Sequence, residues 1–145
     1  MNASDPYNLQ RFVDAQSHCY ERVCQELSEG YKQSHWMWFI FPQLKGLGHS
    51  AMANLYGISS LQEAGAYLQH PILGPRLRHC VGLVLQINSR PVEEIFGDPD
   101  DLKFRSCVTL FANTAGDNAI FKDAIQKFFA GKPDRLTIDG LYPRQ

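Results

Sequence analysis

The feature that most constrains the fold is a series of short helical patterns, each bounded by glycine or proline. The clearest one covers residues 5–30, where apolar side chains recur at three- and four-residue steps and predict one buried stripe. Asp5 and Pro6 are typical of a helix start, and Gly30 is typical of a helix end. The stripe consists of Leu9, Phe12, Val13, Gln16, Cys19, Tyr20, Val23 and Leu27.

The rest of the chain repeats this pattern. Ser60 and Glu63 have the spacing of a capping box, and Asp98-Pro99 repeats the cap-then-proline start. The tail 132–145 has no clear pattern, although its apolar residues Leu136, Ile138 and Leu141 are candidates for docking on the body. Further helices are predicted over 50–56, 60–70, 71–87 (starting at Pro71 or Pro75), 99–111 and 117–131, with one or two turns over 91–97.

The apolar run from Trp36 to Phe41 fits a helix or a strand, because apolar residues fill both alternations. Its neighbours all have helical patterns, which favours a short helix. With no convincing strand pattern elsewhere, we expect an all-α or mainly α fold of six to seven helices. No repeat or linker divides the chain, so residues 1–145 are expected to form a single domain.

Composition excludes several classes of protein. The 145 residues are 44% hydrophobic and 20% charged, as in ordinary globular proteins, and the formal net charge of −1 gives no basis for binding nucleic acid or anionic membranes. No apolar run is long enough to cross a bilayer, and the N-terminus lacks the features of a signal peptide. We therefore expect a cytoplasmic protein. Its oligomeric state is not indicated.

Cysteine and histidine spacing argues against a metal site. The chain has no CxxC pair and no HExxH pattern, and its cysteines fall inside predicted helices. In a reducing cytosol, such cysteines are small apolar core residues. We expect neither a metal nor a cofactor.

The segment 34–50, SHWMWFIFPQLKGLGHS, is the best candidate for the wall of a site. Trp36 and Trp38 are suited to stacking on a planar ligand, although two large aromatic residues in an apolar run more often form core. The loop that follows contains Gln43 and Lys45 and leads into a helix start, which favours an anion. Its spacing matches no phosphate-binding motif, so an ordinary glycine turn is the alternative. His35 is a weak candidate for a catalytic acid or base, with backbone hydrogen bonding as the alternative.

The predicted helix around residues 101–110 supplies the second half of the candidate site. Ser106 is a hydroxyl on its inner side, and such groups need a partner or bond the preceding turn of their own helix. Arg105 would pair with an anionic ligand or with Asp101 at the surface. If the two segments meet, the ligand contacts are Trp36, Trp38, Gln43, Lys45, Arg105 and Ser106.

Three blocks of the sequence resemble a known family. SHWMWFIFPQLKGLGHSAMANLYGI, SSLQEAGAYLQHPILGPRLRHC and EEIFGDPDDLKFRSCVTLFA, in this order, are similar to the small bacterial proteins of domain of unknown function 1810. The resemblance extends from Asp5-Pro6 to the segment 131–134. It implies a mainly helical, single-domain cytoplasmic protein and no established reaction, cofactor or partner.

Three functions stay open from the sequence. The first is a small-ligand-binding domain, with a pocket between residues 34–50 and 101–110 for a nucleotide-like or planar anionic compound. The second is a hydrolase or transferase acting on such a ligand with His35 as acid or base. The third is a non-catalytic module that docks a partner protein through an exposed apolar patch. Whether the protein is an enzyme is left open.

Overall fold

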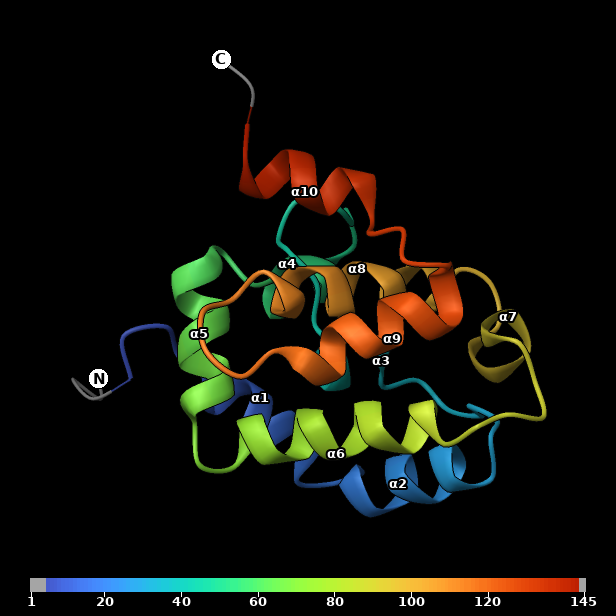
Figure 1. The fold of residues 1–145 in the computed structure, drawn as a ribbon. Helices are drawn as coiled ribbons and strands as arrows, with labels where there is room; N and C mark the ends of the chain where they lie inside the picture. Colours follow the sequence, from blue (N-terminus) through green and yellow to red (C-terminus); the bar gives the residue numbers. More distant parts are fainter. Residues whose placement is uncertain (1–4, 144–145) are drawn as a thin grey trace.

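The computed structural model describes residues 5–143 and shows a bundle of short helices (Figure 1). This part of the chain contains ten α-helices, so the predicted helical class is confirmed and the predicted number of six to seven is wrong. The helices are α1 (Gln10–Gln16), α2 (Tyr20–Ser28), α3 (Met37–Ile40), α4 (Ala51–Tyr56), α5 (Leu61–Gln69), α6 (Leu73–Leu85), α7 (Val92–Phe96), α8 (Asp100–Ala112), α9 (Ala119–Phe129) and α10 (Arg135–Leu141).

One of the additional helices arises because the predicted helix over 5–30 is broken. Cys19 leaves helical geometry, with φ −142° and ψ −2°, so α1 and α2 are separate. The break follows Gln16, whose buried side chain is held by residues far away in the sequence. The buried Gln16 amide donates to the Phe39 carbonyl oxygen across 2.8 Å and to the Tyr67 hydroxyl across 3.2 Å. Turning the chain after α1 lets α2 pack against α6 while Gln16 keeps these bonds.

The second difference is in the tail, which was predicted to be irregular. Residues 135–141 form α10, which packs on α8 and lies above it in Figure 1. Of the residues predicted to dock, Leu136 is 65% exposed and does not, whereas Leu141 is half-buried against the core; the buried residue of this helix is Thr137. The last two residues of the predicted tail, 144 and 145, lie outside the described residues.

Local cap chemistry sets the middle of the chain as predicted. The Ser50 hydroxyl accepts from the Ala53 N–H across 3.1 Å at the start of α4, and the Ser60 hydroxyl accepts from the Glu63 N–H across 3.1 Å at the start of α5. These bonds satisfy backbone N–H groups that have no partner inside the helix. The aromatic segment is the short helix α3, as favoured from its neighbours.

The core is organised around α8, which packs against α5, α7, α9 and α10. Nine of its residues are buried, so α8 is enclosed on most sides and its polar residues must find partners inside the protein. Phe104 lies at its centre and meets Phe41 edge-on, with ring centroids 5.1 Å apart. This contact joins the aromatic segment to α8 and brings the two predicted halves of the site together.

The part of the chain that the structure describes has no helix long and apolar enough to span a membrane. All four cysteines have free thiols; Cys80 and Cys107 are buried, while Cys19 and Cys24 are half-buried. Burial is the main cause that raises the pKa of the Cys107 thiol well above its ordinary value, so it stays protonated and is a poor nucleophile.

Candidate functional site

The segments 34–50 and 101–110 meet around a small hollow, which we call the Trp38 hollow. Its apolar walls come from α3, α4 and the start of the loop after α3, and Lys103 closes it from α8. It is lined by Met37, Trp38, Phe41, Gln43, Ala53, Tyr56, Gly57 and Lys103. Of the predicted ligand contacts, the structure thus brings Trp38 and Gln43 together.

Apart from the Tyr56 hydroxyl, the polar side-chain groups at this hollow are the Lys103 ammonium and the Gln43 amide. The Lys103 ammonium lies 5.1 Å from the centroid of the half-buried Trp38 ring, within cation–π range. It is also 3.6 Å from one carboxylate oxygen of Asp100, whose other oxygen is 2.7 Å from the Lys32 ammonium. Asp100 is therefore shared between two cations, which leaves Lys103 with positive charge to offer at the mouth of the hollow.

The hollow is narrow as it stands. Its volume is about 10 Å³, room for about one water molecule. One wall is rigid, because the Tyr56 ring packs against Phe12 and Phe39 with centroid distances of 5.7 and 5.4 Å. A ligand larger than water therefore requires movement of Trp38, Lys103 or the segment that carries Ala53.

Trp36 is placed in the core, away from the hollow. It is 1% exposed, and its indole N–H donates to the Glu26 carboxylate across 3.0 Å. Glu26 also accepts from the backbone N–H groups of Gln33 and Ser34 and from the Ser34 hydroxyl. Burial by itself would raise the pKa of Glu26, but these donors outweigh it and hold its pKa below the ordinary value. Trp36 is thus fixed by a buried carboxylate and has no free face for a ligand.

Arg105 and Ser106 face the chain before α10 and do not line the hollow. The Arg105 guanidinium donates twice to the Lys132 carbonyl oxygen, across 3.1 and 2.9 Å. The Ser106 hydroxyl is 3.1 Å from the Leu102 carbonyl oxygen and 3.2 Å from an Asp134 carboxylate oxygen. Both residues therefore have structural partners, and Lys103 takes the position at the hollow that the sequence assigned to Arg105.

No feature of the sequence singles out Lys103 among the basic residues of α8. Lys103 and Arg105 are two residues apart and so point about 200° apart around the helix, which means that only one can face the aromatic segment. The choice depends on how α8 is rotated in the core, and packing of Phe104 sets this rotation.

Lys45 and His35 both lie outside the hollow. Lys45 is exposed, and its backbone N–H donates to the Ile58 carbonyl oxygen across 2.8 Å. It borders a separate open depression with Arg11 and Glu63. His35 is exposed at the entry to α3, and among residues 5–143 the structure records no hydrogen bond or ion pair of its side chain.

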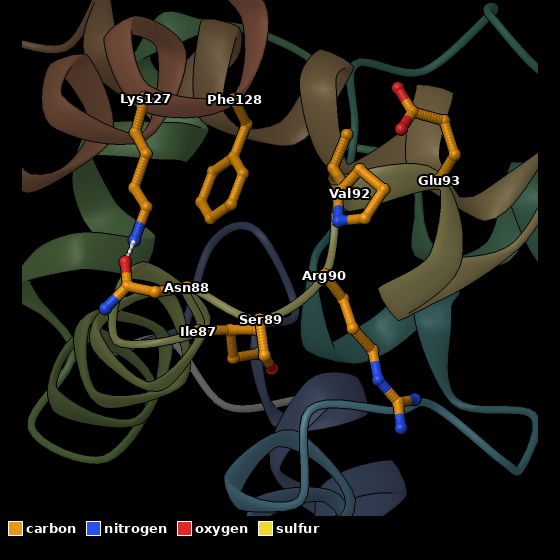
Figure 2. Close-up of a pocket in the computed structure, with 9 residues that line it drawn as sticks. Ile87, Asn88, Ser89, Arg90, Val92, Glu93, Lys127 and Phe128 are labelled. Atoms are coloured by element: carbon orange, nitrogen blue, oxygen red, sulfur yellow. Dashed lines mark hydrogen bonds between the residues drawn. The ribbon is translucent and has the colours of Figure 1, made fainter.

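A larger depression of about 390 Å³ lies between the end of α6, the start of α7 and the end of α9. Figure 2 shows the Lys127 ammonium next to Asn88 and the Arg90 side chain extending away from both. Lys127 donates to the Leu85 carbonyl oxygen and to the Asn88 side chain, so it caps the end of α6. The Arg90 guanidinium lies 5.4 Å from the Tyr31 ring. The two cationic side chains of this depression contact different partners, and the depression is widely open to solvent.

Within the described residues, no three His, Cys, Asp or Glu side chains gather closely enough to hold a metal ion. One buried carboxylate oxygen, Oδ1 of Asp101, has no hydrogen-bond partner in that part of the chain. Asp101 lies in the first turn of α8 and does not line the Trp38 hollow.

Comparison with known proteins agrees with the three sequence blocks and the helical architecture. The sequence profile of the family described as "Protein of unknown function (DUF1810)" matches residues 6–141. The chain belongs to the DUF1810 family. Among solved structures, the conserved hypothetical protein Rv1873 from Mycobacterium tuberculosis is 54% identical, with 97% of this chain and 100% of that chain covered and a TM-score of 0.94. No curated protein shows significant similarity to this DUF1810 member.

Proposed function

We propose that this protein binds a small planar anion in the Trp38 hollow. The observation that carries the proposal is the Lys103 ammonium 5.1 Å from the Trp38 ring centroid, at a concave site bounded by a second aromatic ring, Tyr56. A planar ligand would stack on the indole, and its negative charge would pair with Lys103. The Gln43 amide offers a donor and an acceptor to fix the orientation.

The chemical class follows from the lining. Apolar and aromatic walls with a few polar groups are typical of sites for small organic ligands. One cation at one end favours a ligand with an aromatic ring and one carboxylate or phosphate group, such as an aromatic acid or a nucleoside monophosphate. Free thiols at all four cysteines suit a reducing compartment, and a cytoplasmic location is part of this proposal.

Binding is favoured over catalysis because of where the candidate acid or base lies. His35 does not line the hollow, and no residue of the hollow is an acid, a base or a nucleophile of the kinds used in hydrolysis or group transfer, apart from the Lys103 amine and the Tyr56 hydroxyl. For the interaction-module alternative, nothing within residues 5–143 indicates a partner protein.

The test is a thermal-shift and calorimetric screen with benzoate, nicotinate, AMP and IMP. A compound present at about 100 times its dissociation constant stabilises the fold by about 2.7 kcal/mol, which is readily measured. We expect Lys103→Met and Trp38→Leu each to weaken binding by about tenfold or more, because each removes a main contact. Arg105→Met is the matched control on the same helix, with binding unchanged. Absence of binding by every compound, or an equal loss in the Arg105 variant, would contradict the proposal.

A further inference from the structure

A second feature concerns how a ligand would enter so narrow a hollow. Residues 45–56, which include α4, contain no buried residue, although they follow the buried Leu44 and come shortly before the buried Ile58. Leu44 and Ile58 form a parallel bridge, in which Ile58 N–H donates to the Gln43 carbonyl oxygen across 2.9 Å. The segment thus leaves the body and returns at nearly the same point, like a short Ω-loop. We call residues 45–56 the flap.

At its start, the flap is tied by the Lys45 N–H, which donates to the Ile58 carbonyl oxygen across 2.8 Å, and most of its other described contacts with the body lie at its C-terminal end. There, Tyr56 packs on two core rings, and the Arg11 guanidinium donates to the carbonyl oxygens of Leu55, across 2.8 Å, and Gly57, across 3.1 Å. Farther back, Leu47 and Met52 are half-buried against the core. A segment with so little buried surface opens at lower free energy than the core helices do.

We infer that the flap opens about its two ends and admits the ligand to the Trp38 hollow. Ala53, on the inner side of α4, is the flap residue that closes the hollow opposite Lys103 and Trp38, while Tyr56 stays with the core. Moving residues 46–54 outward removes Ala53 from the mouth and leaves both aromatic walls in place. This inference rests on the proposed function, and the flap motion itself is measurable without any ligand.

Gly57 provides a variant that acts on the base of the flap. Its φ of −66° and ψ of 139° suit alanine, but an added Cβ would lie 2.8 Å from the Cα of Lys45. Contacts this short force the neighbour to shift, and here the neighbour is backbone at the other end of the flap. Gly57→Ala therefore pushes the two ends apart. Gly65→Ala, where a Cβ meets nothing within 4 Å, is the matched control.

The experiment is amide hydrogen exchange of the full-length protein at increasing low concentrations of urea. We expect the α4 amides, including Asn54 N–H, which donates to the Ser50 carbonyl oxygen, to exchange through local opening with little dependence on urea. The α8 amides should exchange only through global unfolding, with a strong dependence. Gly57→Ala should speed exchange in α4 by about tenfold, and Gly65→Ala should leave it unchanged.

Without any ligand, two results would overturn the inference: α4 amides with the same urea dependence as those of α8, or no effect of Gly57→Ala on their exchange. A third measurement separates this outcome from failure of the proposed function. Whichever of benzoate, nicotinate, AMP or IMP binds should slow exchange in α4 at saturation. If a compound binds without slowing exchange in α4, the flap is not the entry, but the proposed binding site stands. If α4 opens locally and no compound binds, the flap motion stands, but the proposed ligand binding is refuted.

Discussion

The Arg11 guanidinium donates to the Glu63 carboxylate across 3.0 Å and ties α1 to the first turn of α5. Glu63 is 4% exposed at its side chain and Arg11 15%, so the pair is shielded from water. Arg11 also donates to four backbone carbonyl oxygens, so its five N–H groups have five acceptors. These carbonyls belong to Tyr7, Asn8, Leu55 and Gly57.

Arg11→Ala should lower the free energy of unfolding by about 3 kcal/mol, because it leaves a buried carboxylate without its cation. Urea denaturation at neutral pH measures this loss. Arg135→Ala is the control: Arg135 and Asp139 form an exposed pair at 3.7 Å, and its removal should cost less than about 0.5 kcal/mol. Similar losses in the two variants would show that Arg11 is no more than a surface residue.

Glu26 gives a pH-dependent prediction. Its pKa is lowered in the folded protein, so its carboxylate stabilises the fold above the unfolded pKa of about 4.3, and this contribution is lost as pH falls through the lower folded value. Glu26→Gln should therefore cost about 2 kcal/mol at pH 7, and the difference from wild type should shrink as pH falls below about 4.

Urea denaturation between pH 3 and pH 7, followed by Trp fluorescence, checks this, because the Trp36 indole donates to Glu26. Glu29→Gln, at an exposed residue just after α2, should change stability by less than about 0.5 kcal/mol at every pH. A constant gap between Glu26→Gln and wild type over this pH range would contradict the assigned role.

How far the sequence predicts this fold depends on whether the causes are local. The Ser50 and Ser60 caps were predictable because each hydroxyl bonds an amide three residues ahead. The break after Gln16 was not predictable, because the Gln16 amide binds the carbonyl oxygen of Phe39, which is 23 residues away. The tail helix α10 depends likewise on contacts with residues more than 20 positions earlier, such as Thr109.

Only part of the candidate site could be predicted, because most of its residues are positioned by contacts that are distant in sequence. From the sequence, a shared site depended on the hypothesis that the two segments meet; in the structure, Phe41 and Phe104 make contact between them. It did not distinguish Trp36 from Trp38, because both occur in one apolar run. Glu26 determines which tryptophan is buried, because its carboxylate accepts a hydrogen bond from the Trp36 indole inside the core. In sequence, Glu26 has the appearance of a solvent-facing charge on a helix.

Two neighbouring aspartates at the start of α8 should respond in opposite directions to loss of charge. Burial, with the carboxylates of Asp98 and Glu93 adding to it, raises the pKa of Asp101. A carboxyl with a raised folded-state pKa destabilises the fold above that pKa and has no such effect below its unfolded value near 4. Asp101→Asn should therefore raise the free energy of unfolding at pH 7 and change it less at pH 3.5.

Asp100→Asn should instead lower the free energy of unfolding at pH 7 by about 3 kcal/mol, because the Lys32 ammonium, 2.7 Å away, loses its partner. The Lys32 side chain is 7% exposed and has little access to water as a substitute. Thermal and urea unfolding of the Asp100→Asn and Asp101→Asn variants at pH 7 and pH 3.5 test whether the two changes have opposite effects on stability. A loss of stability in both at pH 7 would refute the assignment for Asp101.

Gly74 permits the close approach of α5 and α6. A Cβ on Gly74 would overlap the carbonyl oxygen of Leu68, which is backbone and cannot rotate away. Gly74→Ala should therefore destabilise the protein by about 3 kcal/mol. Gly65→Ala in α5, with open space at the Cβ, should stabilise it by about 0.5–1 kcal/mol. Unfolding midpoints that move in the same direction would contradict this account of the helix pair.

The last prediction concerns Asp134, which docks α10 on α8. One of its carboxylate oxygens accepts from the Thr137 N–H across 3.0 Å, from the Thr137 hydroxyl across 2.6 Å and from the Ser106 hydroxyl across 3.2 Å. Its own N–H donates to the Thr109 hydroxyl across 2.8 Å. A helix of seven residues is too short to be stable alone, so these bonds and its packing decide whether α10 forms.

Asp134→Ala should lower the free energy of unfolding by about 2 kcal/mol, since a helix cap and the bond to Ser106 are lost together. It should also increase amide exchange in α10 while exchange in the core of α8 stays slow. Ser106→Ala, which removes one bond, should cost about 1 kcal/mol. The exposed Asp139 gives the control, with Asp139→Ala near neutral. If exchange in α10 is the same in Asp134→Ala as in Asp139→Ala, then packing alone holds this helix, and the Asp134 cluster contributes nothing to its docking.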